Sequence, residues 1–416
     1  MPIFVPFKAY RPTSDKAKAI ACRPYDVLNA KEAKQEAHGN PLSFYHVIKP
    51  EIDFDESHNP YAPEIYKKGK TNFDSLVENG VIFQDEKPAF YVYELTMNDH
   101  VQTGLVGCCA IDDYFNNVIK KHELTRPDKE EDRKNHIRSS QLNYEPVFLS
   151  YPKADAIDAL VEKFKIEAPI YDFTADDGIK HRLWIVNEDN DLEQIESLFK
   201  TNVSSIYIAD GHHRTAAGAL VGREFRDNGK STLNGEARNN YFMAVVFPDN
   251  QLKILDYNRV IKDLNGLTEE GLLEAVAKKF DLETKNEAYR PETLHTFGMY
   301  LNNQWYKLTA KSGTFNDSDP IGELDVTILS DNVLEPIFNI VDLRKDKRIE
   351  FVGGLRGLGE LEKRVDSGEM AIAFSMYPVS MKQLIAISDN DLLMPPKVTW
   401  FEPKLRSGLF VHDISE

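Results

Sequence analysis

The apolar and polar positions show two kinds of segment along the chain, one with the pattern of a strand and one with the pattern of a helix. Short runs that are rich in β-branched or aromatic residues, or that alternate with polar residues, predict strands at residues 43–49, 90–96, 104–111, 146–150, 206–209 and 371–376. Longer amphipathic segments predict helices at residues 30–38, 64–79, 128–141, 154–165, 192–200, 269–280, 326–334, 360–366 and 380–388. This mixed order predicts an α/β (α+β mixed) fold.

Two further patterns bear on how the chain divides into domains. Residues 241–247 and 252–257 are predicted to pair as a hairpin, because Pro248, Asp249 and Asn250 form a turn signal between them. A boundary near Lys262 separates them from a lobe with its own helices and strands. We therefore expect a core, an additional α/β lobe, and a C-terminal segment that packs back on the core, at residues 1–262, 263–345 and 346–416.

The stretch Ser204–Leu220 reads as a buried strand, a tight turn and a helix. The first turn of that helix carries His212, His213 and Arg214. A helix N-terminus already presents unpaired N–H groups and a partial positive charge, so these side chains would add to an anion site. The pattern predicts a phosphate-binding turn.

A purely structural alternative exists for the same turn. Asp210 would cap the helix by accepting a bond from the His212 or His213 N–H group, and Arg214 would pair with a surface carboxylate. Three cationisable groups so close together repel one another unless an anion or a carboxylate compensates them. This crowding favours the binding site over the simple cap.

A second group of chemically active residues surrounds His122 and Glu123. It reads either as a solvated charged helix with its lead-in loop or as a functional loop that Arg126 and Pro127 stiffen. No second histidine follows His122 at the spacing of a zincin motif. Adjacent His212 and His213 lie about 100° apart around a helix, so they do not easily share one ion. We assign no metal ligands from the sequence.

The composition narrows the class of partner. A formal net charge of −17 argues against nonspecific binding to nucleic acids or anionic membranes. No run of about 18 apolar residues predicts a membrane span, and the N-terminus lacks the pattern of a secretory signal. Three cysteines suggest no disulfide framework. We expect a cytoplasmic protein.

Six short phrases stand in order along the chain: Arg23-Pro-Tyr-Asp-Val27, His122-Glu-Leu-Thr-Arg-Pro127, Lys129-Glu-Glu-Asp-Arg133, Ala209-Asp-Gly-His-His-Arg214, Leu324-Asp-Val326 and Met394-Pro-Pro-Lys397. Together they resemble domain of unknown function family 1015, nearly from end to end. That family is similar to the ParB/sulfiredoxin superfamily, whose hallmark is an Asp-Gly-His-Arg or Gly-Cys-His-Arg turn. The resemblance implies a ParB/sulfiredoxin-like core with large insertions, and a turn that binds nucleotide phosphates.

Members of that superfamily act differently: ParB proteins hydrolyse CTP on DNA, sulfiredoxins repair a sulfinic acid, and free-serine kinases phosphorylate L-serine. His212 stands where a sulfiredoxin has its cysteine, and the acidic charge argues against a ParB role. The resemblance implies an ATP-dependent kinase that acts on free L-serine or a related hydroxy compound. A CTP- or ATP-sensing module with slow hydrolysis and a metal-dependent hydrolase remain alternatives, and a homodimer stays open.

The same resemblance implies roles for individual residues. The nucleotide phosphates, with Mg²⁺, would be held by Asp210, Gly211, His212, His213, Arg214 and Thr215. Catalysis would involve His213 and a general base, for which Asp26 is preferred to Glu123 by analogy with the acid that the kinases carry in their N-terminal region. The small substrate would be held by Arg23, His122, Arg126 and Lys397.

Overall fold

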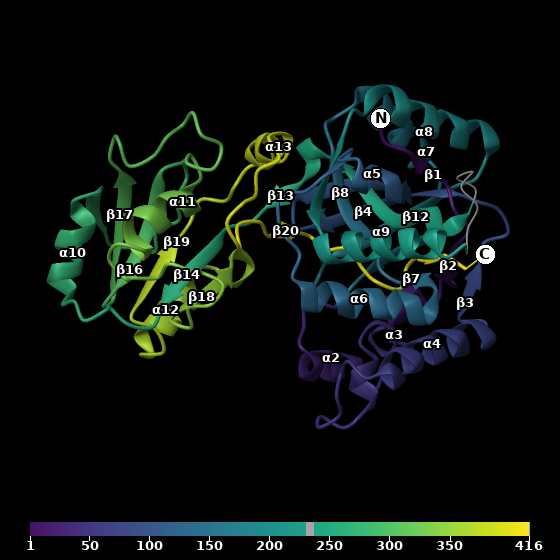
Figure 1. Cartoon of the computed structure of the whole chain (residues 1–416), viewed down its shortest axis with the longest axis horizontal. Coiled ribbons are helices and arrows are strands. Elements are labelled where there is room, and N and C mark those ends of the chain that lie inside the picture. Colours follow the sequence, from purple (N-terminus) through teal and green to yellow (C-terminus); the bar gives the residue numbers. More distant parts are fainter. Residues whose placement is uncertain (230–236, 416) are drawn as a thin grey trace. The chain divides into compact units, whose positions relative to one another are not determined.

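A computed structural model describes residues 1–229 and 237–415 of the chain (Figure 1). Contacts between Cα atoms divide it into two compact units. Unit 1 comprises Met1–Leu252 with Pro403–Glu416, and unit 2 comprises Lys253–Glu402. Each unit has its own sheet and its own apolar core.

Unit 1 is built on a nine-stranded sheet in the order β6-β11-β8-β12-β5-β4-β10-β9, with β1 paired to β5. Most neighbouring strands are antiparallel, but β11 runs parallel to β6 and β12 runs parallel to β8. The strands are β1 (Phe4–Val5), β4 (Phe90–Met97), β5 (His100–Ala110), β6 (Ile119–Lys120), β8 (Val147–Tyr151), β9 (Tyr171–Thr174), β10 (Lys180–Val186), β11 (Ile206–Asp210) and β12 (Tyr241–Pro248).

A second, four-stranded sheet in unit 1 has the order β3-β2-β21-β7. It pairs a strand from the beginning of the chain with one from its end, since Ala9 lies opposite His412 and Tyr10 opposite Val411. This pairing places the C-terminal residues within unit 1. Its strands are β2 (Ala9–Pro12), β3 (Ile82–Gln84), β7 (Leu142–Asn143) and β21 (Val411–Asp413).

The helices of unit 1 are α1 (Ala17–Ile20), α2 (Ala30–Ala37), α3 (Tyr45–Ile48), α4 (Pro63–Glu78), α5 (Ile111–Phe115), α6 (Pro127–Ser140), α7 (Asp155–Phe164), α8 (Asp189–Asn202) and α9 (His212–Asp227), with short 3-10 turns η1 (Pro50–Asp53), η2 (Arg238–Asn240) and η3 (Asp249–Gln251). Helices α9, α6 and α4 pack against one another in that order (Figure 1). Helices α7 and α8 contribute Ile157, Leu160, Ile195 and Phe199 to the main core.

Helix α9 packs very closely on its neighbours. A Cβ at Gly218 would lie 3.1 Å from Phe242 of β12, and one at Gly222 would lie 2.3 Å from the Asn239 carbonyl oxygen. The packing therefore requires glycine at position 222 and leaves little room for a side chain at Gly218. This contact fixes the position of the first turn of α9, because the helix cannot lift off the sheet without opening the core.

Unit 2 contains a six-stranded antiparallel sheet in the order β15-β17-β16-β19-β14-β18 and a separate pair, β13 with β20. Its strands are β13 (Lys253–Ile254), β14 (Tyr257–Ile261), β15 (Phe280–Lys285), β16 (Thr296–Leu301), β17 (Gln304–Ala310), β18 (Ile349–Gly353), β19 (Ile372–Ser375) and β20 (Phe401–Glu402). Its helical segments are α10 (Glu269–Ala277), α11 (Asp325–Leu329), the π-helical η4 (Ser330–Leu334), η5 (Gly354–Arg356), α12 (Leu358–Asp366) and α13 (Met381–Asp389).

The structure confirms the predicted mixed α/β fold, but it divides the chain differently from the sequence-based division. Strand β14 lies between β19 and β18, so residues from both sides of the expected boundary near Lys262 share one sheet. Only Pro403–Glu416 returns to unit 1. The segment 346–402, expected to pack on the core, belongs to unit 2 because its strands complete the unit 2 sheet.

Two local predictions are corrected. Residues 43–49 contain the helix α3 and no strand; its apolar side chains are buried on every side, and such a run cannot be told from a strand by periodicity alone. The expected hairpin at 241–257 does not form, since β13 pairs with β20. None of the helices in the described ranges has the length and apolarity that crossing a membrane requires.

Candidate functional site

The turn between β11 and α9 consists of one residue. Strand β11 ends at Asp210 and α9 begins at His212. Gly211 between them has φ 91° and ψ 35°, a left-handed conformation that residues with a Cβ adopt only at a cost. A Cβ here would also lie 3.1 Å from the nearest Arg214 guanidinium nitrogens. Glycine therefore lets the strand pass directly into the helix with Arg214 folded against the turn.

A β-bulge precedes the turn. In the pairing of β11 with β8, Ile208 lies opposite Leu149 and Asp210 lies opposite Phe148, which leaves Ala209 as an extra residue. Bulges redirect the side chains that follow them.

No side-chain hydrogen bond within the described chain caps α9. The described hydrogen bonds of Asp210 come from Arg214 and Lys404 and not from the first-turn N–H groups, so the capping that the purely structural alternative expects is not seen. The other half of that alternative is present, because Arg214 pairs with the carboxylates of Asp210 and Asp26. N–H groups at a helix N-terminus are in general able to bind an anion.

The parallel pairing of β6 with β11 brings a distant loop to the same place. Ile119 lies opposite Ile206 and Lys120 opposite Tyr207, so both strands end at one edge of the sheet. His122 and Glu123, which follow β6, are thereby placed beside His212. Nothing in the local sequence pattern indicates this pairing.

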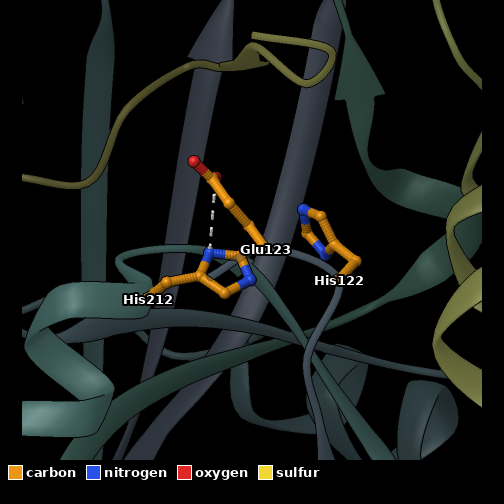
Figure 2. A group of neighbouring side chains, drawn as sticks. All are labelled: His122, Glu123 and His212. Atoms are coloured by element: carbon orange, nitrogen blue, oxygen red, sulfur yellow. Dashed lines mark ion pairs between the residues drawn. The ribbon is translucent and has the colours of Figure 1, made fainter. Parts of the chain in front are cut away.

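His122, Glu123 and His212 form a compact group, with one potential donor atom from each within 4.8 Å of the others (Figure 2). His212 Nδ1 lies 4.0 Å from Glu123 Oε2. The two imidazole rings meet edge to face, with their centroids 4.4 Å apart. Sequence reasoning named all three residues but assigned none of them to a metal.

Both of these imidazoles are neutral at neutral pH. His122 is 1% exposed, and burial lowers its pKa to about 4. Burial, and then the adjacent His122 ring, lower the pKa of His212 well below its ordinary value. The sequence placed three cationisable groups in this turn, His212, His213 and Arg214. Burial lowers the pKa of both histidines, so the positive charge of the turn comes from Arg214 and from one further side chain.

Arg214 supplies part of that charge from inside the protein. It is 7% exposed; its Nη1 donates to the Pro146 carbonyl at 3.0 Å, and its Nη2 lies 3.4 Å from Asp210 Oδ2. Burial alone would lower the pKa of Arg214, but Asp26, Glu145 and Asp210 outweigh burial and raise it. The guanidinium is therefore a permanent charge beneath the turn.

Lys404 supplies the second charge, from the C-terminal segment of unit 1. Its Nζ lies 3.2 Å from Asp210 Oδ2. Burial would raise the pKa of Asp210, but Lys404 and then Arg214 outweigh it and lower that pKa. Asp210 therefore remains ionised, and it orients both cations.

Two partly exposed carboxylates flank the turn. Asp26 Oδ2 lies 4.0 Å from Arg214 Nη2, and its side chain is 39% exposed. The side chain of Glu123 is 42% exposed. Both carboxylates are therefore partly exposed to solvent, and Asp26 is the one that contacts the guanidinium.

His213 faces the other residues of the second loop. Its Nε2 accepts a hydrogen bond from the Arg126 backbone N–H at 2.9 Å, which places the proton of the neutral ring on Nδ1. Burial lowers the pKa of His213. The Arg126 side chain itself pairs with Asp128 at 2.8 Å and is 68% exposed. The loop and the first turn of α9 are thus joined through a neutral imidazole.

Three further residues that the sequence assigned to the site make contacts outside the group of His122, Glu123 and His212. Arg23 forms an ion pair with Glu36. The Thr215 hydroxyl donates to the Gly211 carbonyl at 3.0 Å, within the first turn of α9. Lys397 belongs to unit 2, where its Nζ lies 5.7 Å from the centroid of the Tyr257 ring.

The site residues assigned from the sequence do not include two residues that the structure brings close to Asp210 or Arg214. Lys404 lies in a proline-stiffened C-terminal loop, for which the sequence left open a cover over an anionic ligand or a structural brace, and nothing in its spacing points to Asp210. Glu145 lies in a short connection and gives no sequence signal, but it accepts from the Tyr25 N–H at 3.0 Å and lies 3.7 Å from Arg133. Glu145 and Arg214 line a cavity of about 40 Å³ together with Arg133 and His136.

Comparison with solved structures finds distant likenesses. A free serine kinase in complex with AMP shares 13% identity, with a TM-score of 0.34, over 72% of this chain and 86% of that chain. A conserved hypothetical protein from Pyrococcus furiosus shares 13% identity at a TM-score of 0.34, over 72% and 90%. SbnI with a C-terminal truncation, from Staphylococcus aureus, shares 11% identity at a TM-score of 0.35, over 73% and 85%.

No curated protein matches this chain. A family model described as protein of unknown function (DUF1015) matches residues 4–327, which is more than half of the chain. The match covers both the Arg23 to Val27 phrase and the strand–turn–helix at Asp210. The chain therefore belongs to the DUF1015 family.

Proposed function

We propose that unit 1 transfers a phosphoryl group from ATP to a small hydroxy compound, with free L-serine as the first candidate. One observation carries the proposal. An uncapped helix N-terminus, entered through a left-handed glycine, has the guanidinium of Arg214 beneath it and the accessible carboxylate of Asp26 4.0 Å from that guanidinium. An anion site and a potential proton acceptor therefore adjoin each other.

The first turn of α9 would bind the nucleotide phosphates. Phosphoryl transfer depends mainly on positioning and on stabilising charge, so backbone N–H groups and a fixed cation are the required elements. Arg214 fits this role because its buried Nε has no hydrogen-bond partner among the described residues. Lys404 would add a second charge, held in place by Asp210.

The substrate hydroxyl would lose its proton to a carboxylate at the edge of the turn. A general base must reach the hydroxyl directly or through one water molecule. Asp26 is our first choice, because its exposure leaves room for a small substrate and its contact with Arg214 keeps it near the phosphates. Glu123 is the second choice.

Mg²⁺ would arrive with the nucleotide. This ion prefers oxygen ligands and is usually bound by one or two carboxylates together with phosphate oxygens. Whichever of Asp26 and Glu123 does not act as the base fits that requirement, whereas Asp210 already pairs with Lys404 and Arg214. Bound Mg²⁺ would neutralise charge on the transferring phosphoryl group.

The direct test is an assay of the purified full chain with ATP, Mg²⁺ and L-serine. We expect O-phosphoserine and ADP in equal amounts, measured by mass spectrometry. A panel of small hydroxy acids would replace serine in parallel reactions. The absence of any phosphorylated product across the panel would contradict the proposal. Calorimetry would then separate a sensing module, which binds ATP or CTP without synergy from any metabolite, from a chain that binds no nucleotide.

A further inference from the structure

We propose that His122, Glu123 and His212 bind one divalent transition-metal ion, of the class of Zn²⁺ and its first-row neighbours. The site consists of two imidazoles and one carboxylate, a donor set that occurs in zinc sites with three protein ligands. Figure 2 shows the two rings and the carboxylate gathered around a common space. The proposal concerns metal binding and does not depend on phosphoryl transfer.

The unsatisfied nitrogens of the two histidines carry the argument. Both ring nitrogens of His122, which is 1% exposed, and Nε2 of His212, which is 6% exposed, make no hydrogen bond of good geometry in the described part of the chain. The Ile208 carbonyl is near enough to the His122 ring to raise its pKa slightly against burial, but it leaves the second ring nitrogen of His122 and Nε2 of His212 without any acceptor or donor among the described residues. Buried polar atoms without partners are uncommon in native proteins, and an ion is one of the accepted explanations. Here such atoms belong to two rings that touch each other.

The distances also fit an ion. Zinc binds imidazole nitrogen and carboxylate oxygen at about 2.0–2.2 Å, so two ligand atoms around one ion are about 3.4 Å apart in tetrahedral geometry. The potential donor atoms lie within 4.8 Å of one another, and His212 Nδ1 lies 4.0 Å from Glu123 Oε2. Small side-chain rotations would close these gaps. Glu123, with 42% of its side chain exposed, is the least enclosed of the three.

The donor set selects the class of ion. Mg²⁺ and Ca²⁺ prefer oxygen ligands, which this group offers only through Glu123. Imidazole suits Zn²⁺ and its first-row neighbours. Three protein ligands leave a fourth position open to water or to another ligand beside the first turn of α9. With Glu123 bound to the ion, Asp26 becomes the remaining carboxylate for proton transfer in the proposed kinase reaction.

The test is a titration of untagged, chelator-treated full-length protein with Zn²⁺, in competition with a chromogenic chelator and without nucleotide. We expect saturation at one ion per chain, retained in millimolar Mg²⁺. His122→Gln and His212→Gln should weaken binding by more than the roughly 10–100-fold that loss of an outer-shell partner costs. His46→Gln, which alters a partly exposed imidazole 2.6 Å from Asp53, should leave it unchanged.

Folding is controlled by recording circular dichroism and the unfolding temperature of each variant in chelator. If a buried histidine variant does not fold, Glu123→Gln replaces it, because that side chain is partly exposed. Zn²⁺ should raise the unfolding temperature of the wild type by mass action and should raise that of the site variants less. No saturable binding, or one-ion binding that survives all three substitutions, would overturn the proposal. A chain that binds Zn²⁺ but phosphorylates nothing would refute only the proposed function.

Discussion

Lys404 Nζ lies 3.2 Å from Asp210 Oδ2, which joins the C-terminal segment of unit 1 to the turn at the start of α9. The contact links residues 194 positions apart. Both side chains are mostly buried, with 15% and 27% of their surfaces exposed. The turn therefore contacts a residue that lies near the C-terminal end of the chain.

Lys404→Met should lower the free energy of unfolding by about 1.5–3 kcal/mol at pH 7, the range for hydrogen bonds to charged groups. Lys404 lowers the pKa of Asp210, so this stabilisation is present above the unfolded-state pKa of Asp and declines as the pH falls below about 4. Urea unfolding at pH 7 and pH 3 measures both effects. Lys18→Met removes an exposed pair with Asp176 and should change little. Equal decreases in the free energy of unfolding in the two variants would show that the contact of Lys404 with Asp210 stabilises no more than an exposed ion pair.

Arg214→Lys should weaken ATP binding by about 1.5–3 kcal/mol, or roughly 10- to 150-fold, because lysine keeps the charge but loses the planar fork of donors. Isothermal titration calorimetry measures the change. Arg138→Lys is the matched control, since Arg138 pairs with Glu224 on the surface of α9 away from the turn. Unchanged affinity in Arg214→Lys would remove this residue from the nucleotide site.

Asp26→Asn should lower kcat by about 10²–10⁴-fold, the usual contribution of general acid–base catalysis, with little change in KM for ATP. The substitution keeps the size of the side chain but removes the proton acceptor. Steady-state kinetics with the accepted hydroxy substrate provide the measurement. A large loss in kcat in Glu123→Gln together with no loss in Asp26→Asn would identify Glu123, and not Asp26, as the general base.

Gly211→Ala should destabilise the protein more than Gly80→Ala does. Both glycines have positive φ, 91° and 68°, so both alanines pay for the left-handed conformation, by about 1 kcal/mol or more. At Gly80 nothing lies within 4 Å of the added Cβ, whereas at Gly211 the Arg214 guanidinium lies 3.1 Å away. Thermal unfolding compares the pair. Equal changes would show that the contact with Arg214 costs nothing.

Asp325→Asn should raise the unfolding temperature above that of the wild type by more at pH 8 than at pH 5. Burial raises the pKa of Asp325 to about 7, against the opposing hydrogen bond from the His295 N–H, and its Oδ2 has no partner among the described residues. The folded state thus favours the neutral form, and wild-type stability falls as the pH rises between about 4 and 7. Asparagine mimics that neutral form. If the variant and the wild type differ in unfolding temperature by the same amount at pH 5 and pH 8, the raised pKa of Asp325 is disproved.

The strand–turn–helix at residues 206–220 was predictable because its signals are local. The β-branched run, the glycine and the small helix face lie within one short segment, and the structure places β11 and α9 there. Local patterns likewise located α4, the charged helix α6 and the apolar strand β5. Information of this kind requires no knowledge of which segments pair.

The parts that escaped prediction depend on pairing between distant segments. The parallel alignment of β6 with β11 places His122 against His212, and no local pattern encodes that alignment. The expected contribution of the histidines to the charge of the turn also failed for a tertiary reason, because burial lowers the pKa of His212 and His213. A sequence supplies the types of side chain, but their ionisation depends on burial in the fold.

The short pair of β13 with β20 has a consequence for the history of the chain. Lys253 lies opposite Glu402 and Ile254 opposite Phe401, so the entry and the exit of unit 2 are neighbours. A compact body with adjacent ends can be gained, lost or exchanged as a cassette by two cuts in the gene, without lengthening the path of the remaining polypeptide. Removal of unit 2 would leave the strand–turn–helix itself in place, since β11, Gly211 and α9 all belong to unit 1.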